Sequence, residues 1–294
     1  MSSDNIIAAD PLILQLEQTV AGISNSTLQD IIKYSMLPPG KLIRPRFCLA
    51  ICNALGAAEE NLVSHSVSLE ILHVATLLHD DLPAIDNDDL RRGRPSSHKQ
   101  FSEGQAILAA DYMFGWAIER LAGDLSAYFL NKSATALALT CKEIAEGQIL
   151  DLQNKIEIID DYLQIIDLKT ASLFDCAAYF AGLELRLQGS ELEILRDFGR
   201  SFGMLFQVLN DWHDHCGANQ IVGREVSSDN KNKKNNIFLE RFNSERQLVL
   251  TGLLQKFDLH YSALVKLSQD IGVSNFAKLE SVINPTISEI RRID

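Results

Sequence analysis

Apolar residues recur at steps of three and four positions along most of this 294-residue chain, and this is the spacing of one face of an α-helix. The pattern is clearest from Leu62 to Leu78 and from Ile194 to Leu209. It also covers residues 106–121, 134–152, 173–187, 247–257 and 263–271. Convincing alternation with a period of two, which predicts half-buried strands, is absent from the sequence. The predicted fold class is therefore all-α.

The two clearest helices are apolar around most of their circumference, which predicts central positions inside a helical bundle. One such centre implies one core, so residues 1–294 are predicted to form a single domain. The chain has only 16 glycines and 7 prolines, and this low share of helix breakers agrees with long helices. The polar stretch VSSDNKNKKNN at 226–236 is predicted to be an exposed loop.

Charge and composition exclude several classes of function. A formal net charge of -12 disfavours nucleic acid and anionic membrane surfaces as partners, so an anionic ligand would need locally clustered Lys and Arg. The five cysteines show no C-x-x-C spacing and are predicted to be reduced core residues. The sequence begins without a basic segment followed by an apolar one, and no run of about 18 apolar residues could span a membrane. We therefore expect a cytoplasmic protein without a membrane span.

An acidic cluster follows the first of the two apolar helices, in the segment HDDLPAIDNDDLRRGRP. Its carboxylates belong to Asp80, Asp81, Asp86, Asp88 and Asp89. Carboxylates at this spacing repel one another, and a hard, oxygen-preferring cation is a common remedy, although a solvated acidic turn is the simpler interpretation. Three guanidinium groups suited to an anion follow at once, on Arg91, Arg92 and Arg94. A metal-bridged phosphate or diphosphate would satisfy both sets of charges.

A second acidic cluster ends the other apolar helix, in the segment FQVLNDWHDH. Asn210, Asp211 and Asp214 are spaced by three and four positions, so on a helix they can share one side. Alone, this pattern is weak, and a simple charge cluster at a helix end is the alternative. Facing acidic groups in the core of a bundle can form a metal site, and the pairing with the first cluster favours that interpretation.

These segments resemble the motifs of trans-isoprenyl diphosphate synthases, the polyprenyl synthetases that include farnesyl and geranylgeranyl diphosphate synthases. DDLPAIDNDDLRRGRP is similar to the first aspartate-rich motif of the family, in the bacterial and plant form with two extra residues between the aspartates, and FQVLNDWHD is similar to the second. The other matches, in the family's order, are PPGKLIRP, LEILH, AILAAD, EGQILDLQ, Lys169-Thr170 and GREVSSDNKNKK. The resemblance spans roughly Gly40 to Lys234.

The resemblance implies a role for individual residues. Mg²⁺ would be held by Asp80, Asp81, Asp86 and Asp211, with Asp214 in support. Arg91 would contact the allylic diphosphate that the metal bridges, and the isopentenyl diphosphate headgroup would bind to Lys41, Arg44, His73 and Arg92. The departing pyrophosphate would be stabilised by Lys169, Arg224 and Lys234, with Thr170 and Gln207 near the developing carbocation. Without the resemblance, solvated surface charges and a satisfied core histidine would be the ordinary interpretations.

The implied fold is one large helical bundle of the isoprenoid synthase type with a central metal-binding cavity. The implied activity is Mg²⁺-dependent, head-to-tail prenyl transfer from dimethylallyl, geranyl or farnesyl diphosphate to isopentenyl diphosphate, by ionisation, condensation and elimination. The family also implies a homodimer, for which the apolar helix at 106–121 has enough surface. Small side chains at Ala75 and Thr76, one turn before the first motif, favour a product of twenty carbons or more.

The match has departures that leave alternatives open. The family usually has Asp where Asn210 stands, Lys where Arg224 stands and Thr where Asn236 stands. A non-catalytic or regulatory subunit is therefore one alternative. A class I terpene synthase is another, but its second motif would read NDxxSxxxE, and this chain has Asp214 and Ala218 at the last two defining positions.

Overall fold

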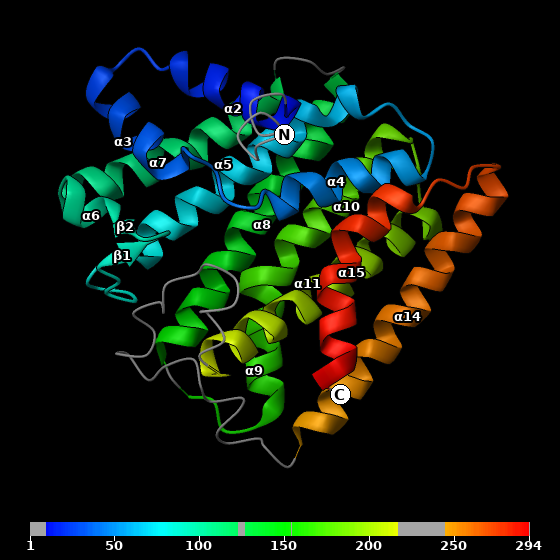
Figure 1. Cartoon of the computed structure of the whole chain (residues 1–294). Coiled ribbons are helices and arrows are strands. Elements are labelled where there is room, and N and C mark those ends of the chain that lie inside the picture. Colours follow the sequence, from blue (N-terminus) through cyan, green and yellow to red (C-terminus); the bar gives the residue numbers. More distant parts are fainter. Residues whose placement is uncertain (1–9, 123–126, 154, 217–244, 294) are drawn as a thin grey trace, which may run out of the picture.

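Helices form nearly all of the regular structure in Figure 1, in a computed structural model that describes residues 10–122, 127–153, 155–216 and 245–293. They are α2 (Pro11–Ala21), α3 (Ser26–Met36), α4 (Ile43–Ala54), α5 (Val63–Asp80), α6 (Ser97–Gln100), α7 (Glu103–Glu119), α8 (Ala127–Gln153), α9 (Ile159–Ile166), α10 (Ser172–Glu184), α11 (Ser190–Cys216), α14 (Arg246–Ile271) and α15 (Ala277–Ile293). Within the described residues, the strands are the two-residue β1 (Leu90–Arg91) and β2 (Arg94–Pro95), which pair antiparallel. The predicted all-α class is confirmed.

The centre of the bundle is formed by helices that are buried on almost every side. Eleven of the thirteen residues of α10 are buried, and α5 has buried residues around its whole circumference. No residue of α11 between Phe198 and Asn210 is exposed. The central positions predicted for α5 and for this part of α11 are therefore confirmed, and α10 is more completely enclosed than its sequence indicated.

A cluster of phenylalanine rings joins four of these helices. The Phe47 ring on α4 lies 5.0 Å from Phe202 and 5.6 Å from Phe198 on α11, measured between ring centroids, and 5.4 Å from Phe174 on α10. Phe257 of α14 packs against Phe198 at 5.7 Å. Offset or edge-to-face aromatic pairs of this kind each add about 1 kcal/mol beyond the burial of their area. The cluster therefore holds α11, which carries the second acidic motif, against α4, α10 and α14.

Several elements differ from the sequence expectation. The segments 247–257 and 263–271 belong to the single helix α14, in which Asp258 and Ser262 between them are exposed while Tyr261 packs against Phe257. Helix α14 ends at Gly272, whose φ of 82° is the left-handed conformation that glycine adopts readily. Cys48, Cys52 and Cys176 are buried as expected, whereas Cys141 is only half-buried, and the side chain of Cys216 lies outside the described residues. Among the described residues, no helix is both long and apolar enough to cross a membrane.

Candidate active site

The first acidic cluster begins where α5 ends, at Asp80. The chain then turns back over the helix end, held by backbone bonds from the Asp86 N–H to the Asp80 carbonyl at 2.9 Å and from the Asp88 N–H to the Asp81 carbonyl at 3.2 Å. Asn87, with a φ of 55°, provides the left-handed residue of this turn. Five aspartates close in sequence are thereby divided between different environments.

Arg91 of β1 binds the inner aspartates of this cluster. Its guanidinium donates to Asp81 through both Nε, at 2.9 Å, and Nη2, and to Asp88 Oδ2 at 3.0 Å. Both carboxylates are buried, and burial raises the pKa of Asp81 although Arg91 opposes the shift. The resemblance assigned Arg91 to the allylic diphosphate and Asp81 to Mg²⁺, but in this structure the two side chains bind each other. Asp89 is exposed and pairs with Lys99 at 2.9 Å.

Asp80 lies on the other side of the cluster, facing the π-helical turn at Asp167–Ala171. Burial raises its pKa to about 7, Lys169 opposes this shift, and the neighbouring carboxylate of Asp86 adds to it. Because the pKa of Asp80 is raised this far, its surroundings stabilise the ionised carboxylate less well than water does. An added cation at this position would lower the electrostatic cost of keeping Asp80 charged.

The π-helical turn places Lys169 against the first cluster. Lys169 Nζ donates to Asp151 Oδ2 of α8 at 2.6 Å. Burial lowers the pKa of Lys169, but Asp151 and Asp80 outweigh this effect and the pKa is raised, so the ammonium group stays charged. Gly147 permits the close approach, because a Cβ there would lie 2.8 Å from Leu168 Cβ and from Lys169 Cγ.

The next residue of the turn, Thr170, connects to the second cluster. Its hydroxyl donates to Gln207 Oε1 at 2.9 Å, and Gln207 Nε2 donates to Asp211 Oδ1 at 2.8 Å. The Tyr162 hydroxyl donates to the other carboxylate oxygen, Asp211 Oδ2, at 2.6 Å. Asp211 is buried, and both of its oxygens are oriented by these donors. Thus the predicted pair of Thr170 and Gln207 lies beside a predicted metal ligand, as part of one hydrogen-bonded chain.

The residues predicted to bind isopentenyl diphosphate come from α5, the region around the start of α4 and the β hairpin. Arg44 Nη1 lies 3.3 Å from His73 Nε2, and the Arg44 guanidinium stacks 5.2 Å from the centroid of the Phe174 ring. Burial, reinforced by Arg44, holds the pKa of His73 well below its usual value, so the neutral ring accepts a hydrogen bond from Arg44. Burial also lowers the pKa of Arg44 to about 10, which leaves it cationic at neutral pH.

Two further cations of this predicted set are placed differently. Arg92 lies 4.0 Å from the buried carboxylate of Glu70, and its φ of 54° is left-handed. Its side chain also packs on Gly40, where a Cβ would lie 3.1 Å from Nη2. Lys41 is exposed. The structure therefore brings Arg44, His73 and Arg92 into one region around Glu70, with Lys41 at the surface beside Gly40.

The donor set fits a hard cation only in part. Asp80, Asp86 and Asp211 offer oxygen ligands of the kind that Mg²⁺ prefers. Among the described residues, however, no three His, Cys, Asp or Glu side chains are close enough together to hold a metal ion. Asp81 is bound by Arg91, and the side chain of Asp214 lies outside the described part of the molecule, as do Arg224 and Lys234. The roles assigned to these residues stay predictions.

Several residues that the structure places here have no role implied by the resemblance. Asp151 anchors Lys169, and both amide atoms of Gln148 are buried without a partner among the described residues. Both residues lie in the matched segment EGQILDLQ, and Glu70 lies in LEILH, so these matches could have indicated them. Tyr162 had no such signal, because its partner Asp211 is 49 positions away.

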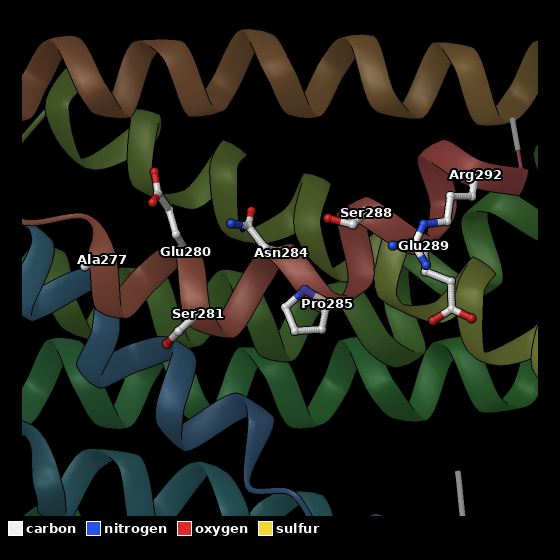
Figure 2. Close-up of a pocket in the computed structure, with 8 residues that line it drawn as sticks. All are labelled: Ala277, Glu280, Ser281, Asn284, Pro285, Ser288, Glu289 and Arg292. Carbon is white, nitrogen blue, oxygen red and sulfur yellow. The ribbon is translucent and has the colours of Figure 1, made fainter. Parts of the chain in front are cut away.

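An open groove runs along α15 (Figure 2). It is lined by Ala277, Glu280, Ser281, Asn284, Pro285, Ser288, Glu289 and Arg292. None of the predicted site residues contributes to this lining. This groove is therefore lined by other residues than those of the candidate site, which lie at the ends of α5 and α11 and at the π-helical turn.

Comparison with known proteins finds geranylgeranyl pyrophosphate synthases among the similar sequences. A heterodimeric geranylgeranyl pyrophosphate synthase large subunit of Arabidopsis thaliana is 33% identical over 214 residues, which are 69% of this chain and 58% of the relative. Across the curated relatives compared, the aligned part is 58–64% of their length. The chain therefore matches somewhat more than half of those proteins.

Solved structures and a family profile extend the comparison. A geranyltransferase from Legionella pneumophila superposes with a TM-score of 0.75 at 27% identity, covering 98% of this chain and 97% of that one. A geranyltransferase from Helicobacter pylori, solved with magnesium and isoprenyl diphosphate, has the same fold, with a TM-score of 0.73 at 22% identity over 97% and 99% of the two chains. Residues 25–257 match the polyprenyl synthetase profile. The chain belongs to the polyprenyl synthetase family, the trans-isoprenyl diphosphate synthases.

Proposed function

We propose that this protein is a trans-prenyltransferase that joins isopentenyl diphosphate head to tail to an allylic diphosphate and releases pyrophosphate. One observation carries the proposal: the π-helical turn presents Lys169 to the first acidic cluster and Thr170 to the second, through Gln207 and Asp211. Wide helical turns of this kind are frequent at functional sites. A cation placed between two acidic motifs suits a ligand that arrives with its own negative charge.

Mg²⁺, when bound to Asp80, Asp86 and Asp211, would neutralise negative charge on the diphosphate of the allylic substrate. Lys169 would add a fixed positive charge close to the leaving group, in a partly buried site where such a charge acts strongly. The Thr170 and Gln207 oxygens would lie near the positive charge that develops on carbon. Loss of pyrophosphate, attack by the isopentenyl double bond and removal of one proton would then give the longer diphosphate.

Arg44, His73 and Arg92 would bind the headgroup of isopentenyl diphosphate without metal. The guanidinium of Arg44 is held by aromatic rings and by His73, so it is oriented before a ligand arrives. The neutral His73 ring does not add charge of its own. The apolar walls of α5, α7 and α10 would exclude water, which would otherwise convert the allylic cation to an alcohol.

We further propose a product of twenty carbons or more. Ala75 is fully buried on α5, five positions before Asp80, so its small side chain faces the interior rather than solvent. The hydroxyl of Thr76, the next residue, donates a hydrogen bond to the His73 carbonyl of the same helix at 2.7 Å. The relatives that are named as geranylgeranyl pyrophosphate synthases support this product length.

The test is an elongation assay of the purified protein. Isopentenyl diphosphate would be supplied with dimethylallyl, geranyl or farnesyl diphosphate, with and without Mg²⁺, and the products identified by mass spectrometry. We expect Mg²⁺-dependent elongation that continues to at least twenty carbons. Folded protein that elongates none of these primers would contradict the proposed activity, and a fifteen-carbon end product would contradict only the proposed length.

A second candidate is a catalytically weak subunit, and the observation that favours it is Asn210. Its amide oxygen can bind Mg²⁺ but brings no charge. We expect Asn210→Asp to lower the Mg²⁺ concentration for half-maximal activity by roughly threefold or more, because ligand charge tunes cation affinity. Asn284→Asp, on the exposed face of α15, is the matched control and should change nothing. An unchanged Mg²⁺ requirement in Asn210→Asp would show that this position does not limit metal binding.

We also propose a homodimer. Helix α7 exposes a row of apolar side chains, Ile107, Leu108 and Tyr112, of which Leu108 is 67% exposed. Exposed apolar rows of this kind are typical of surfaces that bind another protein. Light scattering should give twice the chain mass of 32.7 kDa, and a stable monomer at micromolar concentration would refute the dimer.

A further inference from the structure

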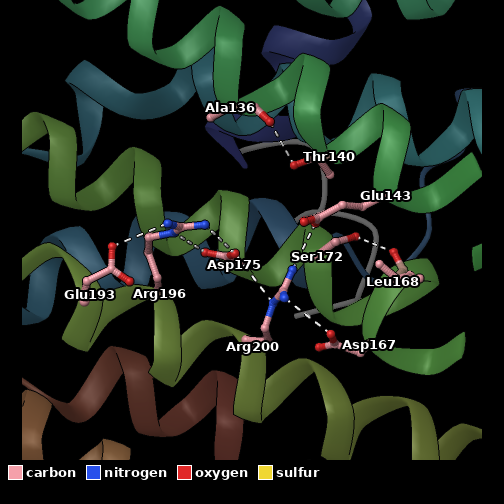
Figure 3. Close-up of polar contacts among 10 residues, drawn as sticks. All are labelled: Ala136, Thr140, Glu143, Asp167, Leu168, Ser172, Asp175, Glu193, Arg196 and Arg200. Carbon is pink, nitrogen blue, oxygen red and sulfur yellow. Dashed lines mark hydrogen bonds and ion pairs between the residues drawn. The ribbon is translucent and has the colours of Figure 1, made fainter. Parts of the chain in front are cut away.

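One arginine of α11 contacts carboxylates on three neighbouring segments (Figure 3). Arg200 Nη2 lies 3.0 Å from Glu143 Oε2 of α8, and Nη1 lies 3.3 Å from Asp167 Oδ2, in the first residue of the π-helical turn. Its Nε lies 3.6 Å from Asp175 Oδ2 of α10. A single guanidinium group therefore neutralises acids on both sides of the turn that carries Lys169 and Thr170.

The turn itself is a wide and unusual segment. The Ser172 N–H bonds to the Asp167 carbonyl, five residues back, and the Ser172 hydroxyl donates to the Leu168 carbonyl at 2.6 Å. Such turns are less favourable than regular α-helix and persist where the surroundings hold them. Helix α11 packs closely against this turn, because a Cβ at Gly203 would lie 2.6 Å from Ala171 Cα.

The positive charge of Arg200 stabilises the carboxylate of Asp167 in the π-helical turn. Burial raises the pKa of Asp167, and Arg200 opposes that shift. Without Arg200, Glu143 and Asp167 would lose the cation that they share and would repel each other, with Lys256 left to oppose the negative charge on Asp167. Asp175 would keep its two hydrogen bonds from Arg196. Asp167 is two residues before Lys169, so a displaced Asp167 would displace the lysine ammonium group and the Thr170 hydroxyl.

Arg196, one turn earlier on α11, provides a natural comparison. It binds Asp175 with two hydrogen bonds, at 2.9 and 3.0 Å, and also contacts Glu193. Within the described residues, its hydrogen bonds and ion pairs do not reach the π-helical turn. Arg196 therefore holds α10 and α11 together at least as firmly as Arg200 does, but without a link to Lys169.

We propose that Arg200 is a positioning residue that sets the place of the π-helical turn, and through it of Lys169 and Thr170; this rests on the proposed prenyl transfer. Arg200→Gln is expected to lower kcat roughly tenfold, because small displacements of catalytic groups have large effects on rate, with the KM for isopentenyl diphosphate within about twofold. Arg196→Gln should keep kcat within about twofold once the folded fraction is accounted for.

A second pair of variants tests the route through Asp167. Asp167→Asn should lower kcat in the same way, and Arg200→Gln combined with Asp167→Asn should be no slower than the worse single variant, because both act on one contact. Fully multiplicative losses, an unchanged kcat in Arg200→Gln, or an equal loss in Arg196→Gln would overturn the proposal.

Hydrogen exchange separates this inference from the proposed activity. Amides of the π-helical turn should exchange faster in Arg200→Gln than in wild type, whereas in Arg196→Gln they should not. If the wild-type protein elongates no primer, the proposed function fails and exchange alone decides the role of Arg200. Equal exchange in the two variants would then refute it.

Discussion

Asp80→Asn is expected to lower the rate of elongation by roughly 1,000-fold, because it removes a charged metal ligand from the place where leaving-group charge must be neutralised. Asp80 is the residue at which α5 ends, and burial with a neighbouring carboxylate already raises its pKa to about 7. Asparagine has nearly the same shape, so the change isolates the charge. Steady-state kinetics at saturating substrates and at several Mg²⁺ concentrations would measure the effect.

The matched control is Asp89→Asn in the same segment. Asp89 is exposed and pairs with Lys99, so its loss should leave the rate within about twofold of wild type, as is usual for surface ion pairs. If Asp80→Asn kept more than a tenth of the activity, or if Asp89→Asn were equally damaging, the first cluster would not be the metal site that we propose.

In the absence of Mg²⁺, Asp80→Asn should be more stable than the wild-type protein, although it is less active. Folding raises the pKa of Asp80 from 3.8 to about 7, so the folded state binds the proton more tightly than the unfolded chain. This lowers the free energy of unfolding progressively as pH rises above about 4, and the loss is complete above about 7. Asp80→Asn should therefore melt at a higher temperature than wild type at pH 8. A lower melting temperature would contradict the buried-charge argument.

The sequence predicted the parts of this molecule that depend on local spacing. The periodicity around Ile71 defined α5, and the run of aspartates after it identified the candidate site, because both patterns lie within a few turns of chain. The pairing of Arg91 with Asp81 and Asp88 could not be predicted in this way. It depends on a turn closed by backbone bonds and on a left-handed Asn87, and no periodicity encodes either.

Long-range contacts account for the rest of what the sequence did not indicate. Lys169 and Asp151 are 18 positions apart, and Tyr162 and Asp211 are 49 positions apart, so only the packing of α8, α9 and α11 brings them together. A hydrophobic pattern of period 3.6 cannot predict the π-helical turn either. The turn depends on close packing against Gly147 of α8 and Gly203 of α11. These contacts define the local environment of the predicted site residues.

Lys169→Gln is expected to lower kcat by roughly 100- to 1,000-fold, the usual effect of removing one group that stabilises developing negative charge. The pKa of Lys169 is raised because Asp151 and Asp80 outweigh burial, so the group is charged throughout the working range. The KM for isopentenyl diphosphate should stay within about threefold, because Arg44 and His73 are untouched. Initial rates measured over a range of both substrates separate these two effects.

Two variants distinguish charge from packing at this position. Asp151→Asn keeps the cation but replaces the acceptor that holds it at 2.6 Å, so it should cost only about tenfold, as expected for a group that orients another. Lys142→Gln, an exposed lysine on the same helix as Asp151, should have no effect. If Lys169→Gln were no slower than Asp151→Asn, Lys169 would act as a structural partner of α8. The cation facing the leaving group would then have to come from elsewhere in the chain.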